Sequence, residues 1–320
     1  MDKLRELHQE FMDQKKYSER LHDATLRGYQ QSFDRLMKKN PNLTLNQLTP
    51  DTMNNFFRLL DTETRTVGRG TEKLGVKAST IETYRSKLNT FFEWLLKQRK
   101  PSGEPKYISI NPFSGIKHPD VKYEDRRWLK HEEIEKILSA VILNVDWLNE
   151  YSRKRNIAII MTLLFTGIRS GELVGLHLTD IDFERRLLTI SDITSKSKRY
   201  RIIAINQKLL MALQDFLQER KKRKLTTPYL FASSIKDERF TANGLKNVLK
   251  QISKASGVKF HAHRFRHTFA INMSLNGTDI YNLKLLLGHQ HIDMTTRYLR
   301  HMPDTRMRAN IDALTLDSLA

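Results

Sequence analysis

The chain has 320 residues and no cysteine, which favours two domains and excludes disulfides, zinc sites with cysteine ligands and thiol catalysis. Its hydrophobic fraction of 39% is enough for a buried core and excludes wholesale disorder. The 55 Lys and Arg residues outnumber the 36 Asp and Glu by 19, a positive charge that indicates a polyanionic partner, DNA or RNA first.

The first hundred residues show the spacing of four helices. Apolar residues recur every three or four positions over 4–12, 26–37, 53–60 and 81–95, and Ser79 with Glu82 forms a capping box ahead of the last stretch. Residues 61–77 are polar and hold three glycines, so we expect a loop or mobile insertion there. The N-terminus is charged and the apolar runs are too short to span a bilayer, so we expect a cytoplasmic protein, associated with the nucleoid in a bacterium.

Residues 100–120 hold four prolines and two glycines, the composition of a domain boundary. We place a helical domain at 1–117, a linker at 118–127 and a second domain at 128–320. In the second domain, periodicity predicts helices over 131–148, 153–167, 207–224 and 241–255, the last ended by Gly257. Two β-rich runs around a polar turn at 187–205 predict a hairpin, and 262–302 is helical in pieces broken at 276–277 and 288. The fold class is therefore mainly α with a small antiparallel β-sheet.

Six polar residues of this second domain stand in apolar surroundings and are of the types that a phosphate group needs. Each lies in a short motif: TGIRSGEL, the turn of the hairpin, HAHRFRHTFA, LLLGHQHID and TTRYLRH. The six are Arg169, Lys196, His263, Arg266, His289 and Tyr298.

Phosphodiester chemistry explains why these residue types occur together. Attack by an oxygen on DNA phosphorus adds negative charge to the non-bridging oxygens, and two arginines, Arg169 and Arg266, can bind those oxygens without a metal. Histidines donate hydrogen bonds or move a proton near neutral pH. A phenol such as Tyr298 has a pKa of about 10 and becomes a nucleophile where cations or a base assist it. A covalent intermediate stores the bond energy, so no ATP is needed, and the chain has no GxxxxGK[ST] loop.

The order and spacing of these motifs closely resemble the tyrosine recombinase (phage integrase) family of lambda integrase, Cre and the Xer proteins. The resemblance covers about 126–302 well. It implies an N-terminal helical core-binding (SAM-like) domain and a C-terminal catalytic domain, which together act as a site-specific recombinase through a covalent 3′-phosphotyrosine on Tyr298. It gives His263 and His289 the hydrogen-bonding or proton-transfer places and assigns protonation of the leaving 5′ hydroxyl to Lys196.

Further positions are supporting residues or candidate DNA contacts. Glu172 and Asp180 stand in family-typical places and are expected to orient Arg169 or hold a helix start, and His267 is expected to pack beside the site. The histidines match no metal template, so we expect no metal, and no cofactor. Lys198 and Arg199 share the turn with Lys196. Alignment with the hairpin of the family favours Lys196 as the catalytic residue. The cationic candidates for DNA phosphates are Arg27, Lys77, Arg85, Lys87, Lys198 and Arg199.

The expected partner is double-stranded DNA, bound by a homotetramer on two sites. An apolar stripe in the tail, Ile311, Leu314, Leu316 and Leu319, suggests docking on a neighbouring protomer, with packing on its own core as the alternative. The need for accessory proteins, the DNA site, and the choice between integration, excision and resolution stay open.

Three other functions compete with recombination. A type IB topoisomerase shares the fold and the chemistry, but the LLGH segment, the apolar tail and the short helical domain favour recombination. A non-catalytic DNA-binding protein of the same fold does not explain why all six side-chain types are present. A helix-turn-helix regulator accounts for the charge and leaves the array without purpose.

Overall fold

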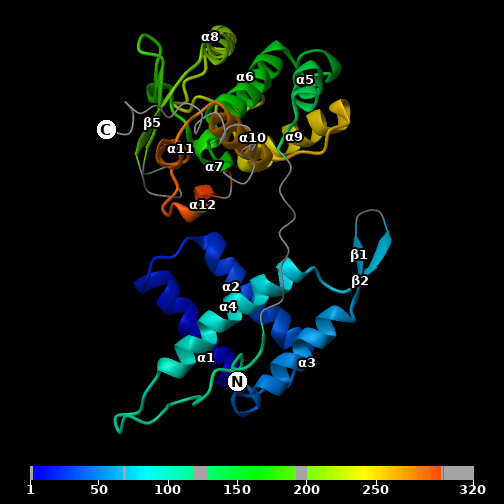
Figure 1. The fold of residues 1–320 in the computed structure, drawn as a ribbon, viewed down its shortest axis with the longest axis vertical. Helices are drawn as coiled ribbons and strands as arrows, with labels where there is room; N and C mark the ends of the chain where they lie inside the picture. Colours follow the sequence, from blue (N-terminus) through cyan, green and yellow to red (C-terminus); the bar gives the residue numbers. More distant parts are fainter. Residues whose placement is uncertain (1–2, 68–69, 118–127, 192–199, 297, 299–320) are drawn as a thin grey trace, which may run out of the picture. The chain divides into compact units, whose positions relative to one another are not determined.

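The computed structural model describes residues 3–67, 70–117, 128–191, 200–296 and 298. The chain divides into two compact units, residues 1–124 and 125–320, each with a hydrophobic core of its own (Figure 1). The expected linker, 118–127, lies outside the described residues. Among the described residues, no helix is both long and apolar enough to cross a bilayer.

Unit 1 is a bundle of the four expected helices: α1 (Lys3–Asp13), α2 (Asp23–Lys39), α3 (Pro50–Asp61) and α4 (Ala78–Lys97). The apolar stripe of each helix faces a common core that includes Leu7, Phe33, Phe56 and Phe92. Thr49 caps α3 by accepting the backbone N–H of Thr52, and Pro50 supplies the first helical residue. The helical spacing of the sequence thus corresponds to buried faces.

A histidine belongs to the core of unit 1. His8 of α1 is 3% exposed and stacks on Phe33 with ring centroids 3.8 Å apart, while Phe91 meets it edge-on. Burial lowers the pKa of His8 to about 4, so the ring is neutral at physiological pH. His8 therefore packs as an aromatic side chain.

The segment 61–77 contains two paired strands, so the prediction of a loop over the whole segment is wrong. Strands β1 (Thr64–Val67) and β2 (Thr71–Leu74) pair antiparallel, with Gly70 in a positive-φ turn position. All four β2 residues are exposed, so no apolar alternation marks the strand, and backbone pairing between threonine-rich segments forms it instead. The capping box at Ser79 is also wrong, because α4 already begins at Ala78 with Lys77 as its N-cap residue.

Unit 2 contains eight α-helices among its described residues: α5 (His131–Ser139), α6 (Glu150–Thr166), α7 (Ser170–Gly175), α8 (Gln207–Lys222), α9 (Ala242–Ser256), α10 (Ala262–Leu275), α11 (Ile280–Leu287) and α12 (Asp293–Thr296). The helix expected over 131–148 is shorter, because a π-helical turn over 140–144 ends it. Gly257 ends α9 in the left-handed conformation, as expected.

The expected hairpin of unit 2 is present and gains a third strand. Strands β4 (Leu187–Ile190) and β5 (Arg201–Ala204) pair antiparallel, with Leu188 opposite Ile203, and β3 (Ile181–Asp182) pairs with the other edge of β4. Inward residues of β4 and β5 are buried and alternate with more exposed ones. The fold class is mainly α with small antiparallel sheets.

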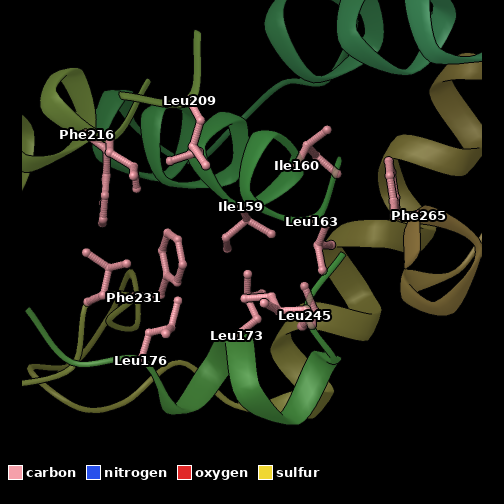
Figure 2. Packing of buried hydrophobic residues seen from close by; sticks show 14 of the residues in the cluster. Ile159, Ile160, Leu163, Leu173, Leu176, Leu209, Phe216, Phe231, Leu245 and Phe265 are labelled. Carbon is pink, nitrogen blue, oxygen red and sulfur yellow. The ribbon is translucent and has the colours of Figure 1, made fainter. Parts of the chain in front are cut away.

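Helix α6 is the centre of the unit 2 core. Figure 2 shows Ile159 and Leu163 of this helix among Leu173 of α7, Phe216 of α8 and Phe265 of α10. Apolar residues occur all round α6, the pattern of a helix enclosed by its neighbours. The C-terminal end of α6, from which the next turn begins, lies within this core.

Candidate active site

The TGIRSGEL motif forms a tight turn between two helices. Helix α6 ends at Gly167, which has φ of 60°, and a Cβ there would lie 2.4 Å from the ring of Phe269. Both the backbone conformation and the close approach therefore require glycine. The turn places Arg169 as the N-cap residue of α7, with its side chain partly exposed.

Glu172 holds Arg169 from within the same motif. Its carboxylate accepts the Arg169 backbone N–H at 2.8 Å and the Nη1 group at 2.9 Å. On its other side the carboxylate accepts two bonds from Arg201 of β5, at 2.6 and 3.2 Å. Burial by itself raises the pKa of Glu172, but the hydrogen bonds and charges of the two arginines outweigh it and lower the pKa to about 2. Glu172 is therefore a buried, ionised carboxylate.

Arg266 of α10 connects the ends of two other helices. Its guanidinium is 1% exposed, donates from Nη1 to the carbonyl of Gly167 at 2.9 Å, and donates from Nη2 to the carbonyl of Leu287. Burial, and next the charge of Arg169, lower the pKa of Arg266 to about 9, which leaves it positively charged at neutral pH. The expected arginine pair is thus brought into one charged cluster.

Three successive carbonyls at the end of α11 accept bonds from three arginines. The carbonyl of Leu286 accepts from Arg201 at 2.8 Å, that of Leu287 from Arg266, and that of Gly288 from Arg169 at 3.3 Å. The last carbonyls of a helix lack intrahelical partners and carry partial negative charge, so they suit guanidinium groups. Gly288, with φ of 62°, ends the helix and turns the chain toward His289. Helices α7, α10 and α11 lie together in unit 2 (Figure 1).

The hydroxyl of Tyr298 lies against the ring of His267, close enough to the cluster to feel the charge of Arg266. Tyr298 is 4% exposed, and its Oη lies 3.0 Å from Nδ1 of His267. The ring of His289 is nearly parallel to that of Tyr298, with centroids 6.5 Å apart, and its Nδ1 bonds to Thr295 Oγ1 at 2.8 Å. The structure therefore brings Arg169, Arg266, His289 and Tyr298 together.

His267 has a more direct contact than the sequence indicated. It was expected to pack beside the site, yet it bonds to the tyrosine hydroxyl. The signal available in the sequence was its spacing, four residues after His263 on one helix face. The rings of His263 and His267 do meet edge to face, with their centroids 4.6 Å apart. His263 itself is exposed on α10.

The other supporting positions differ in what they contact. Asp180 accepts the backbone N–H of His177 at 2.8 Å, so it holds the start of the 3₁₀ turn Leu178–Asp180. Of its two expected tasks, the described contacts favour holding a helix start. Lys196, Lys198 and Arg199 lie outside the described residues. No group of three or more His, Asp or Glu side chains that could hold a metal occurs in the described part of the chain.

The cationic candidates of unit 1 separate into two kinds. Arg27 and Lys77 are exposed, and Lys87 is partly exposed with its Nζ 4.5 Å from the centre of the Tyr29 ring. Arg85, by contrast, is 6% exposed and donates to the carbonyls of residues 116 and 117. The interpretation of Arg85 as a phosphate contact is therefore wrong, because its guanidinium is used inside unit 1.

The arrangement in unit 2 is suited to an anion and a nucleophile. The guanidinium groups of Arg169 and Arg201 bond to the carboxylate of Glu172, and that of Arg266 lies close enough to feel its charge, so the three arginines leave an excess of positive charge in the described cluster. A tetrahedral anion with several oxygens matches such donors, and the Tyr298 hydroxyl beside them has His267 as a hydrogen-bond partner.

Comparison with known proteins agrees with this geometry. The family model described as the phage integrase family matches residues 127–304. The tyrosine recombinase XerC of Staphylococcus epidermidis is 28% identical over 238 residues, which are 73% of this chain and 74% of the relative. XerC of Anoxybacillus flavithermus is 30% identical over 220 residues, 67% of this chain and 68% of the relative.

Two solved structures share the fold. One is the XerH site-specific recombinase bound to palindromic difH substrate in a post-cleavage complex, with a TM-score of 0.72 and 21% identity over 89% of this chain and 78% of that one. The other is a lambda integrase tetramer bound to a Holliday junction, with a TM-score of 0.65 and 19% identity over 91% and 76%. At these identities the likeness concerns the fold.

Proposed function

Since this protein belongs to the phage integrase family, we propose that it is a site-specific DNA recombinase that cleaves and rejoins strands through a covalent bond from Tyr298 to a 3′ phosphate. The observation that carries the proposal is the Tyr298 hydroxyl, held 3.0 Å from His267 beside a cluster of guanidinium groups. A buried tyrosine in a purely structural role needs neither a histidine partner nor adjacent arginines.

The chemistry follows from the charges in the cluster. Tyr298 Oη attacks phosphorus and loses its proton, and we assign the acceptance of this proton to the imidazole of His267, whose Nδ1 lies 3.0 Å away. Arg169 and Arg266 bind the non-bridging oxygens as negative charge builds on them, with His263 and His289 as further donors. The bond to the 5′ oxygen breaks, and Lys196 protonates that oxygen. Attack by a 5′ hydroxyl on the phosphotyrosine then rejoins the strand and restores Tyr298.

Unit 1 supplies sequence-independent contacts in this proposal. Arg27, Lys77 and Lys87 bind backbone phosphates, which position the duplex without reading its sequence. We further propose that residues 1–117 and 128–320 are the core-binding and catalytic domains. Two DNA sites would be joined by a homotetramer, by analogy with the lambda integrase tetramer on its junction.

A nicked suicide substrate tests the central claim. The DNA site is first recovered by selection of bound sequences from a random library, and a nick near the cleavage point then lets the covalent complex accumulate. We expect wild-type protein to form an adduct that resists denaturant, and Tyr298→Phe to form none while still binding the DNA. An adduct with Tyr298→Phe contradicts the proposal. Relaxation of a plasmid that lacks the site indicates a topoisomerase instead.

A further inference from the structure

A third arginine belongs to the cluster and has no role in the chemistry proposed above. Arg201 is the first residue of β5 and is 7% exposed. Each of its three guanidinium nitrogens donates within the protein: Nε to the carbonyl of Leu286, and Nη1 and Nη2 to the carboxylate of Glu172. A guanidinium used in this way is poorly placed to bind a DNA phosphate.

The contacts of Arg201 lead to the groups that bind the phosphate. Glu172 holds both the backbone N–H and the Nη1 group of Arg169. Leu286, whose carbonyl accepts from Arg201, is followed directly by Leu287 and Gly288. The carbonyls of these two residues accept hydrogen bonds from Arg266 and Arg169. Arg201 therefore bonds to both supports of the arginine pair at once, from a third element.

The packing around Gly288 fits the same role. A Cβ at this position would lie 3.0 Å from Nη1 and 3.3 Å from Cζ of Arg201. The guanidinium thus lies against the backbone at the point where α11 ends and the chain turns toward His289. A flat, rigid fork can fill this space and bond in both directions, whereas an ammonium group makes point contacts only.

From this geometry we infer that Arg201 is a positioning residue, which sets the places of Arg169 and His289 by holding Glu172 and the end of α11 together. The inference rests on the proposed function, since it concerns the site that would cleave DNA. If this is so, substitution of Arg201 should lower the cleavage rate by disturbing Glu172 and should leave DNA affinity nearly unchanged.

The experiment compares variants of the full chain on the same nicked substrate. We would measure the single-turnover rate of adduct formation, the Kd for intact site DNA, and the Tm of Arg201→Met, Arg201→Lys, Glu172→Gln and the double variant of Arg201→Met with Glu172→Gln. Arg220→Met is the matched control. Arg220 of α8 is also buried, and it donates to the backbone carbonyls of Thr227 and Tyr229.

We expect Arg201→Met to form the adduct about 10- to 100-fold more slowly, by analogy with residues that orient the ligands of a metal through a hydrogen bond. Its Kd should stay within about threefold of wild type, because phosphate contacts elsewhere dominate affinity. Arg201→Lys should recover part of the rate. The double variant should be no slower than the slower single variant, since both changes break one linkage. Arg220→Met should lower Tm and leave the rate unchanged.

Several results overturn the inference. If Arg201→Met forms the adduct at the wild-type rate, the inference is wrong. It is also wrong if the Kd of this variant rises by as large a factor as the rate falls, because Arg201 would then be a direct DNA contact. A double variant whose loss equals the product of the single losses shows that Arg201 does not act through Glu172. If Arg201→Met does not fold, Arg201→Lys carries the same comparison. Adduct formation by the wild type is measured first. If the wild type forms no adduct, the proposed function is refuted, and this outcome is separate from failure of the inference about Arg201.

Discussion

At the scale of single residues, His267 is a hydrogen-bond partner of Tyr298, the proposed nucleophile. Its imidazole is buried and lies within 3.0 Å of the Tyr298 hydroxyl, whereas His263, four residues earlier on α10, is exposed. The two histidines therefore occupy different environments, and the buried one lies within hydrogen-bond distance of the tyrosine oxygen. In the proposed mechanism, this contact makes His267 the group that accepts the proton of Tyr298.

We expect His267→Phe to slow adduct formation by about 100-fold, the lower end of what a positioned proton-transfer group contributes. Phenylalanine keeps an aromatic ring in the core and removes the nitrogen that meets Tyr298. The measurement is the single-turnover rate on the nicked substrate, with Tm as the check on folding. A rate equal to wild type would mean that the contact serves packing alone.

The same scale shows how a burial pattern corrects a charge pattern. Arg85 looks like a phosphate contact by residue type, yet its guanidinium faces carbonyls 116 and 117 and lies 5.3 Å from the centre of the Phe113 ring. Residue type indicates what a side chain can bind. Which ligand it binds depends on where the rest of the chain places carbonyls and rings.

At the scale of elements, the C-terminal end of α11 organises the site. Three arginines from α7, β5 and α10 converge on its last carbonyls, and a left-handed glycine ends the helix there. The LLGH motif therefore has a physical purpose: it ends a helix so that its free carbonyls and the following histidine face one cluster.

Gly288→Ala tests this element, with Gly257→Ala as its control. Both glycines end helices with positive φ, of 62° and 70°, so each substitution costs about 1–2 kcal/mol of backbone strain. Only at Gly288 would the new Cβ meet Arg201, at 3.0 Å, while nothing lies within 4 Å at Gly257. We expect both variants to be destabilised in urea unfolding, Gly288→Ala more, and only Gly288→Ala to cleave DNA slowly.

Equal cleavage rates in the two glycine variants would contradict this role for the end of α11. Equal losses of stability would show that contact with Arg201 adds nothing to the backbone strain.

Element prediction succeeded where apolar residues repeat along one face and failed where both faces are polar. The helices of unit 1 bury their stripes, so their spacing in the sequence identifies them. The hairpin β1–β2 buries neither face of β2, so it is stabilised mainly by backbone pairing. Backbone pairing leaves little signal in the sequence. Strand β3 has two residues, too short for any periodicity to mark it.

At the scale of the whole molecule, each unit has its own core. The described core residues of unit 1 end at Ile116, and those of unit 2 begin at Trp128 or Leu129. We propose that the domain boundary lies between them, in the segment expected as a linker, 118–127. Cores that do not share residues should remain folded when the chain between them is cut.

Limited trypsin digestion tests this boundary, because Lys122, Arg126 and Arg127 lie in the segment. We expect early cleavage there and two fragments that resist further digestion, identified by mass. Addition of site DNA should slow the cut if both units bind one duplex. Early cleavage within α4 or α6, with no stable fragments, would refute two independently stable domains.

The sequence by itself determined which residues are of the types suited to phosphate chemistry and where most helices lie, because residue type and apolar spacing are local properties. Motif order also identified the family. Only the tertiary structure decided that Arg201 and His267 belong to the cluster of unit 2, and that the guanidinium of Arg85, a candidate phosphate contact, is used inside unit 1. The contact of Arg169 with Gly288 spans 119 residues and that of Arg266 with Gly167 spans 99. Such pairings arise when separate helix ends pack together around α6, and no local pattern in the chain records them.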